Sequence, residues 1–95
     1  MKQMKIDPAY KVDIDFTAPG TKASLKTLQP VVFKEGNAFC CLLGEDPTVG
    51  IFGCGDTAFE AINDWEINLQ KRIDHHEEND ELANYVIDSL KQYKK

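Results

Sequence analysis

The stretch that decides the fold is Gly53-Cys54-Gly55-Asp56-Thr57-Ala58-Phe59-Glu60-Ala61-Ile62. Its glycines are typical of the point where a strand ends and the chain turns. Thr57 and Glu60 have the spacing of a capping box, in which both side chains accept hydrogen bonds from backbone N–H groups at the start of a helix. Asp56 adds negative charge at the positive end of the helix dipole. The stretch therefore predicts a strand, a glycine turn and a capped helix.

A helix over residues 57–73 is predicted to pack on a sheet through one apolar stripe. Its hydrophobic residues recur at spacings of three and four: Ala58, Ala61, Ile62, Trp65, Leu69 and Ile73. This period places them on one face of a helix. Because Trp65 lies near the middle and is the largest of them, we expect it to be the main anchor against the sheet.

Two apolar runs before this stretch predict a β-hairpin. Residues 31–33 and 38–43 flank Lys34-Glu35-Gly36-Asn37, which has turn chemistry. The second run is apolar on both faces, so it is predicted to be the central strand. We expect the helix to cover one of its faces and consider a second subunit as the cover for the other. A third short strand is predicted over residues 49–52.

The segments on either side of residues 30–73 extend this core. Residues 10–16 alternate apolar and charged side chains and predict a strand. Residues 23–29 fit either one helical turn or an irregular strand, and both stay open. After an acidic linker that begins at residue 74, a C-terminal helix is predicted over residues 80–93. Its apolar stripe consists of Leu82, Val86, Leu90 and Tyr93, with Ile87 beside it.

The expected architecture is therefore one α+β domain over residues 1–95. It consists of a three- to four-stranded, mainly antiparallel sheet (a β-β-β-α core over 30–73) with one helix packed on it and an additional C-terminal helix. Residues 1–29 form an N-terminal extension that adds a strand, and residues 74–95 form the acidic linker and last helix.

Composition limits the classes of function. The chain has 95 residues and a net charge of −5, and its acidic residues are concentrated in the C-terminal half. An acidic surface argues against unassisted nucleic-acid binding and favours solubility or a basic protein partner. A solvated loop between two helices is the simpler explanation of the same charges. No apolar run approaches the roughly 20 residues of a membrane helix, so we expect a cytoplasmic protein without membrane contact.

The three cysteines, Cys40, Cys41 and Cys54, are an odd number with one adjacent pair. Adjacent residues on a strand point to opposite faces, so Cys40 and Cys41 suit neither a mutual disulfide nor one metal ion. Free, mostly buried thiols in a reducing compartment are the simplest interpretation.

Four chemical sites can be considered and are not supported by spacing. Gly50, Gly53 and Gly55 do not form a P-loop or dinucleotide motif. His75 and His76 do not combine with the cysteines in the spacing of a zinc site. Nucleophilic catalysis would pair Cys54 with a base such as His75, and nuclease chemistry would use Asp13 and Asp15. We therefore expect no catalytic, cofactor-binding or metal-binding residues, and no enzyme.

Residues 30–73 resemble the HicB-like family of small domains. The resemblance rests on the hairpin at 31–43, the loop with Gly50, and the run Gly55-Asp56-Thr57-Ala58-Phe59-Glu60-Ala61-Ile62. In that family a Gly-Asp-Thr motif, followed two residues later by Glu-Ala, begins the helix that packs on a three-stranded sheet. The resemblance implies a degraded ribonuclease-H-like core, often dimeric, without the catalytic carboxylates of that fold.

The same resemblance implies a function. Family members include antitoxins that block a small ribonuclease toxin, HicA, and many carry a C-terminal DNA-binding segment. After Ile73 this chain has only an acidic linker and one predicted helix, so we do not expect direct DNA binding. We expect a dimeric, non-enzymatic interaction module that binds and occludes a small basic protein, such as a HicA-type ribonuclease toxin. The alternative is a stand-alone dimeric domain that binds nucleic acid or a small ligand in its dimer cleft.

Overall fold

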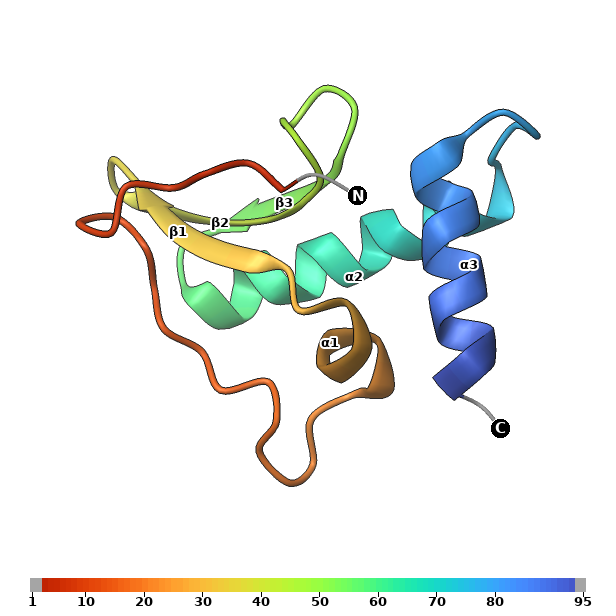
Figure 1. The fold of residues 1–95 in the computed structure, drawn as a ribbon. Coiled ribbons are helices and arrows are strands. Elements are labelled where there is room, and N and C mark those ends of the chain that lie inside the picture. Colours follow the sequence, from red (N-terminus) through yellow and green to blue (C-terminus); the bar gives the residue numbers. More distant parts are fainter. Residues whose placement is uncertain (1–2, 94–95) are drawn as a thin grey trace.

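The two apolar runs form an antiparallel hairpin, and a third strand pairs with its second arm (Figure 1). The structure, a computed structural model, describes residues 3–93. In chain order its elements are α1 (Ala23–Leu28), β1 (Val31–Glu35), β2 (Ala38–Leu43), β3 (Ile51–Gly55), α2 (Ala58–Asp74) and α3 (Glu81–Tyr93). The strand order is β1-β2-β3, so the strand that is apolar on both faces is central, as predicted. The predicted α+β class is confirmed.

Helix α2 covers one face of the sheet through the predicted stripe. Ala61, Trp65 and Leu69 are buried, and Trp65 has no exposed surface. Thr57 is the N-cap, and its hydroxyl accepts a hydrogen bond from the Glu60 N–H at 3.1 Å. The Glu60 carboxylate accepts from the Asp56 N–H at 3.2 Å and not from the Thr57 N–H. The second hydrogen bond of the capping box is therefore shifted by one residue toward the N-terminus. The helix and its anchor are confirmed.

The glycines of this stretch have a different role from the one predicted. Strand β3 runs over 51–55 instead of 49–52, so Gly53 lies inside the strand and Gly55 is its last residue, where a strand end was predicted. Neither has the positive φ of a turn glycine. A Cβ at Gly53 would lie 2.2 Å from the Trp65 backbone nitrogen, and one at Gly55 would lie 2.5 Å from Glu60 Cβ. The glycines are needed because α2 packs directly on the backbone of β3.

The opposite face of the sheet is covered by the chain's own N-terminal segment, shown in red in Figure 1. Cys40 and Leu42 point to this face and are 2% and 0% exposed. Met4 and Ile6 pack against them, and the Met4 N–H donates to the Gly44 carbonyl at 2.8 Å. The chain's own N-terminal segment therefore buries the outer face of β2, for which a second subunit was considered as the cover.

The predicted strand over residues 10–16 is reduced to one β-bridge, between Lys11 and Phe33 of β1. Turns at residues 7–10 and 15–18 bracket this segment, so only its first residues reach the edge of the sheet. Ile14 consequently stays 38% exposed. The ambiguous segment 23–29 is resolved as the short helix α1, whose Leu25 and Leu28 are buried.

Helix α3 packs against α1 and against the C-terminal part of α2 (Figure 1). Ala83 and Val86 are fully buried, with Leu82 and Leu90 half-buried beside the core. The side chain of Tyr93, which we placed on this stripe, lies outside the described residues. No helix within residues 3–93 has the length and apolar character needed to cross a bilayer.

Candidate functional site

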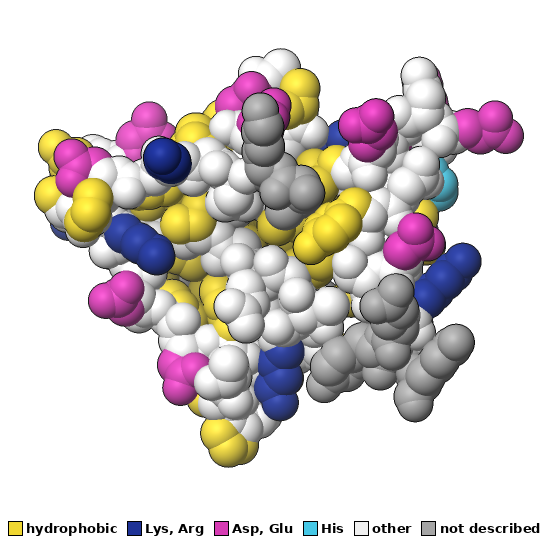
Figure 2. Space-filling view, in the orientation of Figure 1, with side chains coloured by type: hydrophobic (Ala, Val, Ile, Leu, Met, Phe, Trp, Pro, Cys, Tyr) yellow, Lys and Arg dark blue, Asp and Glu magenta, His cyan; other side chains and the backbone are white. Residues whose placement is uncertain are grey.

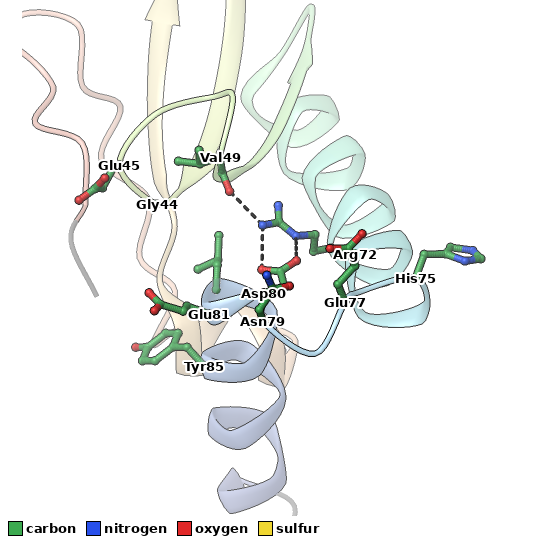
Figure 3. A pocket seen from close by; sticks show the side chains of 11 residues that line it. Gly44, Glu45, Val49, Arg72, His75, Glu77, Asn79, Asp80, Glu81 and Tyr85 are labelled. Atoms are coloured by element: carbon green, nitrogen blue, oxygen red, sulfur yellow. Dashed lines mark hydrogen bonds and ion pairs between the residues drawn. The ribbon is translucent and has the colours of Figure 1, made fainter.

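A large cleft lies where the β2–β3 loop, the end of α2 and the start of α3 meet (Figure 3). Its volume is about 730 Å³. The loop contributes Gly44, Glu45 and Val49, and α2 with its C-cap contributes Arg72 and His75. The linker and α3 contribute Glu77, Asn79, Asp80, Glu81, Leu82 and Tyr85. We call this site the acidic cleft.

Arg72 holds the three walls of the acidic cleft together. Two guanidinium nitrogens, Nε and Nη2, donate to the two carboxylate oxygens of Asp80, a bidentate pair (Figure 3). The same guanidinium donates to the loop carbonyls of Val49 and Gly50 at 3.1 Å and 3.3 Å. The planar fork of arginine suits such simultaneous contacts, which a lysine ammonium cannot reproduce. One side chain thus ties the loop and α3 to α2.

Asp80 has a second role at the start of α3. Its Oδ1 atom also accepts a hydrogen bond from the Ala83 N–H at 3.1 Å, which is the N-cap geometry. The hydrogen bonds from Arg72 hold the pKa of Asp80 below its ordinary value, although partial burial opposes the shift. The hydrogen bond to Asp80 raises the pKa of Arg72. Both groups therefore stay charged and neutralise each other over the whole physiological range.

The remaining charges of the acidic cleft are negative. Glu45, Glu77 and Glu81 are exposed, and none makes an ion pair with another residue of the described chain. Apolar surface lies among them, since Val49 and Tyr85 are 51% and 42% exposed. Figure 2 shows acidic side chains beside hydrophobic surface at this end of the molecule. In Figure 3, Glu81 and Tyr85 extend side by side from α3.

The residues considered from the sequence for metal or nucleophilic chemistry are not brought together. Cys54 lies in β3 beside Asp64, whereas His75 is the C-cap of α2, roughly 16 Å further along the helix axis. His75 points away from the Arg72–Asp80 pair in Figure 3. His76 Nδ1 lies 2.7 Å from the Ile73 carbonyl. Within residues 3–93 no three His, Cys, Asp or Glu side chains are grouped so that they could hold a metal ion.

The other two sequence candidates are explained by local hydrogen bonds. Asp15 accepts from both the hydroxyl and the N–H of Thr17, which lowers the pKa of Asp15, and Asp13 is an exposed neighbour. At the N-terminus of α2, the Glu60 N–H is already bonded to Thr57, and the Glu60 carboxylate occupies the neighbouring Asp56 N–H. A phosphate would have to displace both contacts.

Sequence reasoning missed Arg72 and Tyr85. Arg72 lies beside the apolar stripe of α2. Its partner Asp80 follows eight residues later in the sequence, and the loop carbonyls that it contacts precede it by more than twenty residues. The one available signal was the sequence Asn79-Asp80-Glu81, because Asp is a frequent N-cap and attracts a basic partner. Tyr85 carried no signal, since an exposed tyrosine on a helix is unremarkable until a cleft forms beside it.

Comparison of the chain with models of known protein families, with curated proteins and with solved structures found no significant match.

Proposed function

We propose that this protein is a non-enzymatic interaction module that binds a basic segment of a partner protein in the acidic cleft. The observation that carries the proposal is the combination of Glu45, Glu77 and Glu81 with the exposed side chains of Val49 and Tyr85. Carboxylates attract and orient a lysine or arginine side chain, and the face of a tyrosine ring stabilises the same cation. The aliphatic part of that side chain would lie on Val49.

The edges of the sheet indicate where a protein partner would dock. Both outer edges of the sheet are partly covered by other segments of the described chain, so an added peptide strand would have to displace existing hydrogen bonds. Along β3, the backbone N–H of Cys54 donates to the Asp64 carboxylate at 3.1 Å, and the backbone carbonyl of Phe52 accepts from the Asn68 side-chain amide at 2.6 Å. Along β1, the Val32 carbonyl accepts from the Val12 N–H at 2.8 Å, and the Lys34 N–H donates to the Tyr10 carbonyl at 2.7 Å. The acidic cleft is therefore the favoured docking surface, and electrostatic attraction would raise the association rate.

The proposal is tested by titrating ¹⁵N-labelled protein with a tetra-arginine peptide and following amide shifts by NMR. We expect the shifts to concentrate on the loop between β2 and β3 and on the start of α3. The double variant Glu45→Gln/Glu81→Gln should weaken binding by about tenfold, because two exposed ion pairs together contribute roughly 1–2 kcal/mol.

A charge-matched control distinguishes binding in the acidic cleft from nonspecific attraction to the negative charge of the whole protein. The variant Asp13→Asn/Asp88→Asn removes the same two charges at exposed positions outside the acidic cleft. It should bind tetra-arginine almost as well as the wild type. Equal weakening by the two double variants, or shifts spread over all acidic segments, would contradict a specific site.

At the level of the cell, we propose the antitoxin-like role that the HicB resemblance suggests, in the cytoplasm. The partner would be a small basic ribonuclease toxin encoded beside this chain, with its RNA-binding surface covered by the acidic cleft and α3. Co-expression should rescue growth from the toxin, and Glu45→Gln/Glu81→Gln should lose that rescue while Asp13→Asn/Asp88→Asn retains it. The absence of a neighbouring basic reading frame would argue against this role and would leave the peptide-binding result unaffected.

A further inference from the structure

Two of the three cysteines lie opposite each other on neighbouring strands, away from the acidic cleft. Cys40 of β2 is paired in register with Cys54 of β3. Their Sγ atoms are 2.7 Å apart. Fourteen residues separate the two positions in the sequence, and the register between β2 and β3 brings them together.

The backbone hydrogen bonds define the type of this pair. The Cys54 N–H does not donate to β2, because it points outward and donates to Asp64 Oδ2. The carbonyl of Phe52 points the same way and accepts from Asn68. Cys40 and Cys54 are therefore a non-hydrogen-bonded antiparallel pair, whose Cα atoms lie about 4.5 Å apart with side chains in close contact. That separation is within the range of about 4.4–6.8 Å that a disulfide spans.

Cys41 provides an internal contrast. It points to the opposite face of β2 and is fully buried in the core cluster that includes Trp65. Its partner in the register is Gly53, which has no side chain. The fold thus selects one pairing out of three possible ones.

The two opposed thiols differ in their surroundings. Cys40 is 2% exposed among Phe33 and Leu42, and this burial, together with the Cys54 thiol, raises the pKa of Cys40 to about 12. Cys54 is only half-buried at the outer strand. The Glu35 carboxylate lies 3.7 Å from Cys40 Sγ and is placed to accept its proton. A reagent in solution would therefore meet Cys54 first.

We propose that Cys40 and Cys54 form a reversible disulfide, with a low-molecular-weight disulfide such as oxidised glutathione as the oxidant. The Cys54 thiolate attacks one glutathione sulfur, and the other glutathione leaves as a thiolate. Cys40 then loses its proton through Glu35, attacks Cys54 Sγ and expels the second glutathione thiolate. The two protein thiols lose two electrons and two protons, and the oxidant leaves as two molecules of reduced glutathione. Reduced glutathione reverses both steps.

The crosslink would affect the loop that follows β2. It joins the strands on both sides of the segment that carries Glu45 and Val49, and it restricts the unfolded chain. Oxidation should therefore raise the thermal midpoint of unfolding. The inference depends on the register between β2 and β3 and on the distance between the two Sγ atoms, and it is independent of the function proposed above.

The test uses the intact folded protein in glutathione buffers of graded ratio, followed by alkylation under denaturing conditions and peptide mapping by mass spectrometry. We expect oxidation to remove two alkylatable thiols, leave Cys41 labelled and produce a peptide that links Cys40 to Cys54. Dithiothreitol should restore all three thiols. Circular dichroism before alkylation confirms that the protein is folded.

Two variants complete the test. Cys41→Ala should still form the crosslink, whereas Cys54→Ser should form none. The proposal is overturned if the folded wild type keeps three free thiols at every buffer ratio. It is equally overturned if Cys41 is linked as often as Cys40, or if the link forms only in urea. Mapping of the wild type decides these points even if a variant fails to fold.

Discussion

The two ends of helix α2 are attached to the rest of the molecule by different physical means. At the N-terminal half, Trp65 is completely buried, and the helix backbone lies against the bare glycines of β3. At the C-terminal end, Arg72 joins α2 to the loop and to α3 through hydrogen bonds and one ion pair. The first attachment depends on shape and excludes water. The second depends on charge at a half-exposed site. The attachment at Trp65 should therefore be insensitive to pH and salt, whereas the attachment at Arg72 should depend on both.

Truncation of the anchor should produce the largest effect. Trp65→Ala should lower the free energy of unfolding by about 3–5 kcal/mol, because it leaves a large cavity in a small core. Urea denaturation followed by circular dichroism measures this change. Phe59→Ala on the same helix is the matched control, since Phe59 is 81% exposed and its loss should cost less than about 0.5 kcal/mol.

A conservative change at the same site sharpens this test. Trp65 Nε1 has no hydrogen-bond partner among the described residues. Trp65→Phe therefore removes volume without breaking a hydrogen bond and should cost less than Trp65→Ala. Equal losses for Phe59→Ala and Trp65→Ala would show that α2 does not pack on the sheet through its predicted face.

Adding a methyl group between β3 and α2 should have the next largest effect on stability. Gly53→Ala places a methyl group 2.2 Å from the Trp65 backbone nitrogen, so helix and strand must move apart. We expect a loss of about 3 kcal/mol, at the upper end of the usual cost of overpacking. Gly36→Ala is the control for backbone strain, because Gly36 has φ +60° but open space around its Cβ position. It should cost about 1 kcal/mol. A smaller effect at Gly53 than at Gly36 would contradict the close approach.

At the other end of α2, removal of the arginine fork should have an intermediate effect. Arg72→Gln breaks the bidentate contact to Asp80 and should cost about 2 kcal/mol, the contribution of hydrogen bonds to a charged group. Arg72→Lys should recover only part of this loss, because lysine lacks the planar fork. Lys71→Gln at the exposed neighbouring position should change stability by less than about 0.5 kcal/mol. Chemical denaturation at pH 7 compares the three variants.

The same ion pair predicts how stability depends on pH. The pKa of Asp80 is lowered in the folded state from its ordinary 3.8, so its contribution is complete above that value. As the pH falls below 3.8 and through the folded-state pKa, the carboxylate is protonated and the contribution disappears. Asp80→Asn should therefore be less stable than the wild type by about 1–2 kcal/mol at pH 7, and the difference should shrink below pH 4. A difference that stays constant down to pH 2 would contradict the assigned pair.

The sequence predicted the parts of the fold that depend on near neighbours. The period of three and four around Trp65, the capping residues Thr57 and Glu60, and the two-sided apolar strand all follow local rules, and all three are confirmed. The amino-acid sequence could not show why residue 53 is a glycine, because the reason is the backbone of α2, which packs directly on Gly53. A tight turn and a close approach of two backbones both require glycine, so the sequence alone does not distinguish them.

The candidate site could not be predicted for a related reason. Arg72, Asp80 and the loop carbonyls meet only after α2 has packed on the sheet and the chain has turned from α2 into α3. The pairing of Cys40 with Cys54 likewise requires the register between β2 and β3, which depends on the length of an irregular loop. Residues 10–16 had the alternation of a strand, but the turns on both sides leave only one bridge. Local patterns identify elements, whereas sites arise where distant elements meet.

The smallest effect on stability is expected at the N-cap of α2. It tests whether a hydrogen bond also contributes to the attachment of the N-terminal half of the helix. Thr57→Ala removes the hydroxyl that accepts from the Glu60 N–H and should cost about 1 kcal/mol. Thr57→Ser keeps the acceptor and should retain most of the stability. The Thr57→Ala loss should also be nearly additive with that of Arg72→Gln, because the two sites lie at opposite ends of the helix and share no partner. If the two losses are strongly non-additive, the cap and the ion pair stabilise one cooperative helix, and the two attachments cannot be treated as independent.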